Sequence, residues 1–244
     1  MKVLFLMNSY NELPLLKVKH RYCIQQELDM FVIDNMSNDG TAEYLHENNI
    51  QHSFIDTNNC FDLRPLLKEM QRQLHINKPD WFIYHGMDVF PMTYAGIKQS
   101  IRAAELMGFN MISGTQFTFC NVGYKQTAAN PFVGNYHYKI TFTGAMICKY
   151  DSSVKITPDC ILHPNPFIMN SELAYIETHV FNTPERRQEI LERRQRAWGN
   201  DMPRNWGTHY QEEAHTGFIT PIEKCKDVRD NKWLWDLYGR MFSL

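Results

Sequence analysis

The chain has 244 residues and a formal net charge of −2, with 25 Lys and Arg against 27 Asp and Glu. This length suits one α/β domain, or one domain with a small C-terminal appendage, and it buries a core without help from disulfides or metal. The near-neutral charge excludes a protein held to nucleic acid or anionic lipid by net charge alone. Only a local basic patch could make such contacts.

Signals for targeting and for disulfide formation are mostly absent from the sequence. The opening apolar run, residues 3–7, is too short for a membrane span or for the apolar region of a signal peptide. The six cysteines are scattered and form no C-x-x-C pair, which favours reduced core cysteines over a disulfide framework or a zinc cluster. We therefore expect a cytoplasmic enzyme without a transmembrane segment.

Short apolar runs alternate with helix-period segments in the first half of the chain. The apolar runs predict buried strands at residues 3–7, 30–33, 53–55, 81–84 and 111–113. Apolar spacing between them predicts helices at residues 15–26, 41–49, 63–74 and 97–104. This alternation predicts β-α-β units, and hence an α/β fold with a mostly parallel sheet and helices on both faces.

The second half of the chain differs and predicts a small mixed part. Residues 139–149 alternate polar and apolar side chains, as a half-buried strand does. Residues 115–138 are rich in Gly, Asn, Tyr and Phe, and we expect a long loop over a binding face. Residues 183–185, Thr-Pro-Glu, predict a helix start, and residues 233–241 predict a short closing helix.

Polar residues follow three of the predicted strands, and ligands bind beyond the carboxyl ends of strands in such sheets. These residues are 8–12, 34–39 and Asp88. Asp34 could accept hydrogen bonds from a ring N–H or from ribose hydroxyls of a ligand. An Asx turn in which Asp39 caps the next helix explains the same segment equally well.

The turn after the first strand contains no glycine. A Rossmann fingerprint or a P-loop needs glycines there, so that backbone N–H groups can approach phosphate, and residues 8–17 have none. A bound diphosphate would more readily be held by a divalent cation.

Together these residues resemble the GT-A glycosyltransferases, in particular the broad family 2-like group. That group opens with a strand and an N-E pair, matched at residues 11–12, and continues with D-N-x-S-x-D-G-T, matched at every defined position by residues 34–41. Its next aromatic-led strand ends in D-x-D-E-F, where this chain has G-M-D-V-F over residues 86–90. Gly86 thus replaces the first Asp, and Asp88 keeps the second.

The resemblance implies a GT-A (Rossmann-like) fold and a glycosyltransferase that moves a sugar from a nucleotide-diphosphate sugar to a hydroxyl of a glycan or another acceptor. A UDP-sugar donor, inversion at the sugar carbon and assistance by Mn²⁺ or Mg²⁺ are favoured. The donor-binding residues it implies are Asn11, Glu12, Asp34, Asn35, Ser37 and Asp39. The metal ligands it implies are Asp88 and His179, with His209 and His215 in reserve.

The resemblance covers residues 1–90 well, residues 139–198 loosely and the remainder hardly at all. It implies a catalytic domain at residues 1–198, divided into a nucleotide-binding half that ends at residue 90 and an acceptor half over residues 91–198. Residues 199–244 would form a C-terminal extension packed on this domain.

An inverting transfer needs a general base near the acceptor hydroxyl. The sequence does not single one out. Asp159 and Glu172 follow the alternating strand, where the resemblance implies a base, and Glu172 ranks slightly ahead of Asp159. Each is also explained as surface charge.

A run of arginines predicts either a solvated helix face with ion pairs or a ridge that contacts a polyanionic acceptor. Its members are Arg186, Arg187, Arg193, Arg194 and Arg196. Two further hypotheses stay open. One is a glycosyltransferase acting on hydroxymethylated DNA bases, with nucleic acid as a partner that is not favoured. The other is a catalytically decayed nucleotide-sugar-binding module, which would explain Gly86.

Overall fold

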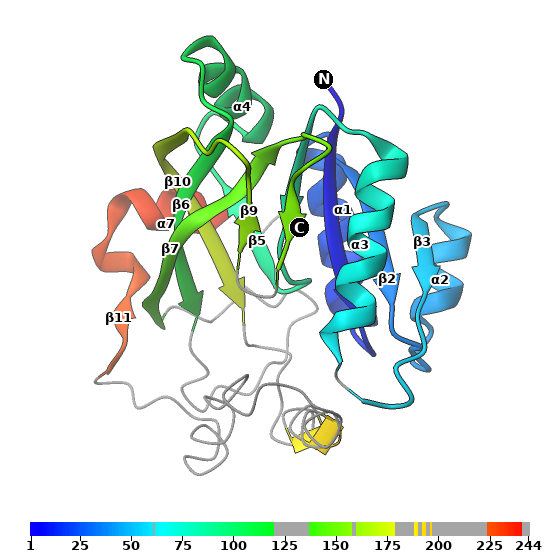
Figure 1. The fold of residues 1–244 in the computed structure, drawn as a ribbon. Coiled ribbons are helices and arrows are strands. Elements are labelled where there is room, and N and C mark those ends of the chain that lie inside the picture. The colour runs from blue at the N-terminus through cyan, green and yellow to red at the C-terminus, as the bar shows by residue number, and fades with distance from the viewer. Residues whose placement is uncertain are drawn as a thin grey trace.

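The structure is a computed structural model that describes residues 1–60, 62–119, 137–157, 160–178, 188–189, 192–193, 196 and 224–240. Within these residues the chain forms a nine-stranded sheet with helices on both faces, and a separate two-stranded sheet (Figure 1). The predicted α/β class is confirmed.

The elements follow the predicted alternation closely as far as residue 113. The first half contains β1 (Val3–Ser9), α1 (Leu13–Gln25), β2 (Asp29–Asp34), α2 (Thr41–Glu47), β3 (Gln51–Phe54), α3 (Leu63–Asn77) and β4 (Trp81–Tyr84). After it come β5 (Val89–Met92), α4 (Ile97–Leu106), β6 (Met111–Phe119), β7 (His137–Lys149), β8 (Lys155–Ile156), β9 (Ile161–Leu162), β10 (Ile168–Thr178), β11 (Lys226–Asp227), the 3₁₀ turn η2 (Val228–Asp230) and α7 (Lys232–Gly239).

The large sheet is parallel from β3 to β4 and mixed beyond β4. Its strand order is β3-β2-β1-β4-β7-β6-β10-β5, and β11 pairs with β7. Strand β7 runs antiparallel to both β4 and β6, so β1 to β4, β6 and β10 all point the same way. Their carboxyl ends therefore meet at one edge of the sheet.

Strand β1 explains why helices cover both faces. Val3, Phe5 and Met7 point to one face and belong to the buried cluster that also contains residues of α1, α2, α4 and α7. Leu4 and Leu6 point to the other face and pack with residues of α3, which lies in front of the sheet in Figure 1. A strand buried on both faces needs apolar residues at every position, which is why this segment is an unbroken apolar run.

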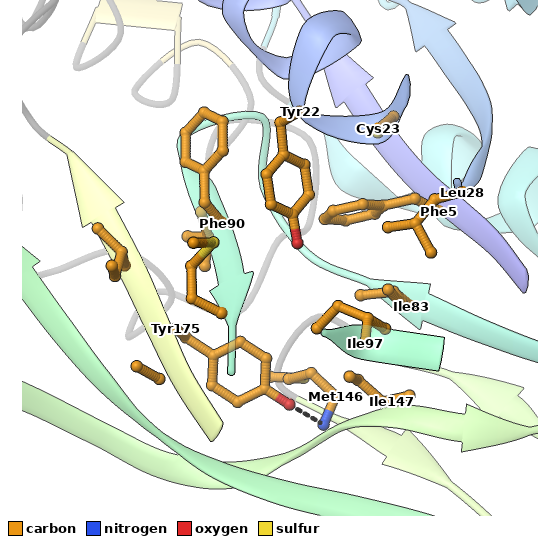
Figure 2. Close-up of a cluster of buried hydrophobic side chains, with 14 of the residues drawn as sticks. Phe5, Tyr22, Cys23, Leu28, Ile83, Phe90, Ile97, Met146, Ile147 and Tyr175 are labelled. Carbon is orange, nitrogen blue, oxygen red and sulfur yellow. Dashed lines mark hydrogen bonds between the residues drawn. The ribbon is translucent and has the colours of Figure 1, made fainter. Parts of the chain in front are cut away.

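Strand β5 was not predicted from the sequence. It has four residues, includes Pro91, and pairs with β10 on one side. Proline is tolerated at the edge of a sheet because its missing N–H is not needed there. Side chains of α1 bind the backbone of β5: Tyr22 Oη donates to the carbonyl oxygen of Pro91, and the Lys19 ammonium donates to that of Val89. Figure 2 shows Tyr22 beside Phe90 in this core.

The prediction of a loop over residues 115–138 is wrong at both ends. Residues 115–119 belong to β6, and residues 137–138 begin β7, because the two segments pair as far as Phe119 and Tyr138. Residues 120–136 lie outside the described residues. Strand β10, also not predicted, pairs with β6 in parallel over its whole length apart from a bulge between Asn170 and Leu173.

The C-terminal helix is confirmed and belongs to the main core. Leu234, Leu237 and Tyr238 of α7 are fully buried, and the ring of Tyr238 stacks on Phe119 with centroids 4.0 Å apart. The helix start predicted at residues 183–185 lies outside the described residues. The five cysteines that the structure describes are free thiols. In the same part of the chain, no helix combines the length and apolar character needed to cross a bilayer.

Candidate functional site

The carboxyl edge of the sheet gathers most of the residues that the sequence singled out. In the strand register Ser9 of β1 lies beside Asp34 of β2. The segment after β4 leads to Asp88, and Val89 lies opposite Glu177 near the end of β10. The candidate site therefore has two parts, the turns after β1 and β2 and the loop before β5.

The turns after β1 and β2 form one hydrogen-bonded unit. Asp34 is fully buried, and its two carboxylate oxygens accept from the backbone N–H of Ser37, at 3.0 Å, and from the Ser37 hydroxyl. Burial raises the pKa of Asp34, and both Ser37 hydrogen bonds oppose that shift. Ser37 Oγ in turn accepts from Asn11 N at 2.8 Å, while Asn11 Oδ1 accepts from Asn38 N at 2.8 Å. Three of the six predicted donor-binding residues thus hold each other in place.

Asp39 connects the starts of two helices. Its Oδ1 accepts from Thr41 N at 3.1 Å and from Thr41 Oγ1 at 2.6 Å, and its Oδ2 accepts from Leu13 N at 2.9 Å. The chain turns between them at Gly40, whose φ of 92° lies in the left-handed region that favours glycine. The Asx-turn interpretation of Asp39 therefore accounts for this carboxylate, and a ligand contact by Asp39 stays a prediction.

Asn35 contacts an arginine from the C-terminal part of the chain. The Asn35 amide satisfies its neighbours when its nitrogen faces Ile55 and Thr57 and its oxygen accepts from Arg193 Nη2 at 2.8 Å. Arg193 is 1% exposed, and its guanidinium carbon lies 3.2 Å from the centroid of the Tyr10 ring. A second contact runs from Arg193 Nη2 to the carbonyl oxygen of Cys60 at 3.4 Å.

These contacts correct the interpretation of the arginine run. Arg193 belongs neither to a solvated helix face nor to a ridge that contacts a polyanion, because its planar group is stacked inside the protein. Arg196 is exposed but binds the backbone oxygen of Asn59 at 3.0 Å. Arg186, Arg187 and Arg194 lie outside the described residues.

The loop before β5 explains why glycine occupies position 86. A Cβ built on Gly86 would lie 2.5 Å from Asp88 Oδ1, so the half-buried carboxylate of Asp88 fills the space of a side chain at position 86. The aspartate that the GT-A pattern has at this position would have to displace the Asp88 carboxylate. The departure from D-x-D is therefore coupled to the position that Asp88 adopts.

A buried lysine lies beneath this loop. Lys19 of α1 is fully buried, and its Nζ lies 4.0 Å from the ring centroid of Phe90 and 4.5 Å from that of Phe5. Burial lowers the pKa of Lys19 to about 7, while the nearby negative charges, including Asp88 and Glu12, raise it. Lys19 thus brings a titratable positive charge close to two of the predicted site residues.

His85 and Glu177 lie next to the loop before β5: His85 directly precedes Gly86, and Glu177 lies opposite Val89. The Gly86 N–H donates to His85 Nδ1 at 3.0 Å, which leaves the proton of the neutral ring on Nε2. Burial lowers the pKa of His85 to about 4, and the charge of Glu177 opposes this shift. Glu177 accepts from Gln116 Nε2 at 2.9 Å and from the Thr118 hydroxyl.

Sequence reasoning missed Lys19, His85 and Glu177. The only signal for Glu177 was its place two residues before His179, at the end of an apolar segment. Glu172, which the sequence favoured as general base, is exposed in the bulge of β10 rather than at the strand end. Asp159, His179, His209 and His215 lie outside the described residues.

No family model matches the chain, and the search of curated proteins finds no match. Solved structures do match. TarS residues 1–349 from S. aureus match with 13% identity and a TM-score of 0.48, over 88% of this chain and 69% of that chain. The same TarS fragment in complex with UDP-GlcNAc matches with 14% identity and a TM-score of 0.41, over 56% of this chain and 39% of that chain.

Glucosyl-3-phosphoglycerate synthase from Mycobacterium tuberculosis, in complex with Mn²⁺, UDP and glucosyl-3-phosphoglycerate, matches with 11% identity and a TM-score of 0.33, over 47% of this chain and 44% of that chain. In two of these three matches the chain spans less than half of the solved chain. At these identities the likeness concerns the fold and not the reaction.

Proposed function

We propose that the chain is a glycosyltransferase that moves a sugar from a nucleotide-diphosphate sugar to an acceptor hydroxyl, with inversion and with the help of a divalent cation. The observation that carries the proposal is the half-buried Asp88 carboxylate, which lies over Gly86 at the same sheet edge as the Asp34 to Asp39 turn. In such sheets ligands bind beyond the carboxyl ends of the parallel strands, and these carboxylates lie there.

The nucleoside of the donor would bind at the turns after β1 and β2. Hydrogen bonds within this unit fix Asn11, Asp34 and Ser37 before any ligand arrives, so little ordering would be needed on binding. Glu12 is the N-cap residue of α1 next to this unit, and its own side chain makes no capping hydrogen bond to the helix. Asn35 offers an amide at the same place, although in the structure this amide contacts Arg193.

Asp88 would hold the cation. Hard carboxylate oxygens suit Mg²⁺ and Mn²⁺. Among the described residues no three His, Cys, Asp or Glu side chains come together as a metal site, so Asp88 would share the ion with the diphosphate oxygens. His179 is the further ligand that the sequence resemblance implies. When bound, such a cation acts as a Lewis acid and neutralises the departing diphosphate.

The general base would be a carboxylate that accepts the proton of the acceptor hydroxyl. Of the described carboxylates we place Glu177 ahead of Glu172, because Glu177 lies opposite Val89 and next to the Asp88 loop. The hydrogen bonds from Gln116 and Thr118 hold the Glu177 carboxylate in place beside this loop. Asp159 remains a candidate from the sequence.

Release of nucleoside diphosphate tests this proposal. The purified protein is incubated with UDP-glucose, UDP-N-acetylglucosamine or GDP-mannose and Mn²⁺, with and without a mixture of glycan acceptors. Asp88→Asn should lower the release rate at least about 100-fold, because a Lewis acid contributes several kcal/mol to the stability of the transition state.

Asp29→Asn is the matched control, since Asp29 begins β2 at the opposite edge of the sheet. Equal loss of rate in both variants, or no loss in Asp88→Asn, would contradict the proposal. Calorimetric binding of UDP without turnover of any donor would instead identify a nucleotide-sugar-binding module.

A further inference from the structure

Arg193 lies in a place that its sequence position does not suggest. It comes from the C-terminal part of the chain, yet its side chain is 1% exposed and stacks on Tyr10, directly after β1. A guanidinium is planar and cationic, and it stacks favourably on an aromatic face. The distance of 3.2 Å between the guanidinium carbon and the ring centroid leaves no room for another group on that face of Tyr10.

The hydrogen bonds of Arg193 reach the next two strand ends. Its Nη2 donates to the side-chain oxygen of Asn35, after β2, at 2.8 Å. It also contacts the carbonyl oxygen of Cys60, in the segment after β3, at 3.4 Å. Arg193 thus combines a flat group on an aromatic ring with N–H donors aimed at an amide and at a backbone carbonyl.

A nucleobase has the same chemistry. It is planar, it stacks on aromatic side chains, and its ring N–H or amino groups donate to amide and carbonyl oxygens. We propose that Arg193 occupies the nucleobase position of the donor site in the nucleotide-free chain, and that nucleotide binds by displacing its side chain from Tyr10. This inference rests on the proposed function, because it assumes that the turns after β1 and β2 receive the nucleoside.

Displacement lowers the apparent affinity for nucleotide. If the competent form, with Arg193 away from Tyr10, is a minor fraction of the molecules, the apparent Kd is the intrinsic Kd divided by that fraction. Removing the guanidinium makes the competent form dominant. Nucleotide should then bind more tightly, on the order of tenfold, since one stacked cation and its hydrogen bonds no longer compete.

Calorimetry with two probes, uridine and UDP with Mn²⁺, tests the inference on the full chain. Arg193→Ala and Arg193→Gln should both bind either probe about tenfold more tightly than the wild type. Arg196→Ala is the matched control, because the Arg196 guanidinium is exposed and binds Asn59, and it should leave both affinities unchanged. Circular dichroism and thermal melting confirm that each variant is folded.

Weaker or unchanged binding of uridine in the Arg193 variants would overturn the inference. Loss of UDP affinity with unchanged uridine affinity would also overturn it and would assign Arg193 to the diphosphate. A measurement on the wild type stands in for any variant that does not fold: the Arg193 Nε–Hε resonance should shift when uridine is added, and a constant resonance at saturating uridine overturns the inference.

The two proposals fail in distinguishable ways. If neither the wild type nor any variant binds uridine or UDP, the proposed function fails and this inference fails with it. If the wild type binds both probes and the Arg193 variants do not bind more tightly, only this inference fails. Binding by the Arg193 variants but not by the wild type supports both.

Discussion

The ammonium group of Lys19 donates a hydrogen bond to the carbonyl oxygen of Val89, the residue directly after Asp88. This bond joins α1, whose first turn follows the predicted donor site, to the loop that carries the predicted metal ligand. Because Lys19 is fully buried, no water can replace it as a donor without repacking the core around Phe5 and Phe90. This hydrogen bond therefore fixes the two parts of the candidate site relative to each other.

The pH dependence of stability should reveal the buried Lys19. Its pKa falls from 10.5 to about 7 in the folded protein because of burial. Above about pH 7 and below about pH 10.5 the unfolded state then binds more protons than the folded state, so the free energy of unfolding rises with pH in this window. Below the window the cost of the buried charge is fully present. We expect a rise on the order of 1 kcal/mol per pH unit in the wild type relative to Lys19→Met.

Urea denaturation of both proteins near pH 7 and near pH 9.5 measures this difference. The comparison with Lys19→Met removes the titration of all other groups. A difference that does not change between the two pH values would show that Lys19 is not desolvated in solution.

Gly86→Ala should change metal dependence more than stability. The new Cβ would lie 2.5 Å from Asp88 Oδ1, so the carboxylate must rotate away from its present position. We expect the Mn²⁺ concentration for half-maximal activity to rise about tenfold, with the free energy of unfolding changed by less than about 1 kcal/mol. Gly239→Ala is the control, since nothing lies within 4 Å of a Cβ built there. An unaltered metal dependence would mean that turnover uses another orientation of Asp88.

Ser37→Ala should destabilise the turns after β1 and β2. The variant loses the hydroxyl that donates to the buried Asp34 and accepts from Asn11 N. We expect the free energy of unfolding to fall by about 1–3 kcal/mol, because a buried carboxylate loses a donor and a backbone N–H loses its acceptor. Chemical denaturation at neutral pH measures this loss.

Ser153→Ala provides the comparison for Ser37→Ala. Ser153 likewise donates to a preceding aspartate, with its N–H 2.8 Å from Asp151 Oδ1, but it lies two residues after that aspartate and on the exposed surface. Its replacement should cost less than about 0.5 kcal/mol. Equal losses in the two serine variants would argue that burial of Asp34 adds nothing.

Glu177→Gln and Glu172→Gln separate the two described candidates for the general base. If Glu177 accepts the acceptor proton, Glu177→Gln should lower kcat about 100-fold or more, leave the KM for the donor within about twofold, and remove the acidic limb of the pH–rate profile. Glu172→Gln should change kcat by less than about twofold, because Glu172 is exposed in the β10 bulge. The reverse pattern would assign the base to Glu172.

Local sequence patterns were sufficient for the first half of the fold. Strand β1 and helix α3 could be predicted because burial on both faces or on one stripe leaves a direct periodic signal. The Asp34 to Thr41 turn could be predicted as an ordered polar segment because part of its bonding is local, from Ser37 to Asp34 and from Thr41 to Asp39. Its bonds to Asn11 and Leu13, 26 residues away, leave no such signal. Strands β5 and β10 could not be predicted in this way. Strand β5 has only four residues, including Pro91, which is too few to show a periodic pattern, and a bulge interrupts the pattern of β10.

The sequence by itself determined strands β1 to β4, the helices between them and the edge at which polar side chains gather. Only the tertiary structure decided which charged residues leave solvent, Lys19 beneath the Asp88 loop and Arg193 on Tyr10, and which polar groups bind Glu177. The physical reason is the distance along the chain between the residues that interact. A periodic pattern records which side of its own element a residue faces, whereas a buried charge depends on partners that folding brings from distant positions, and their spacing along the chain does not encode them.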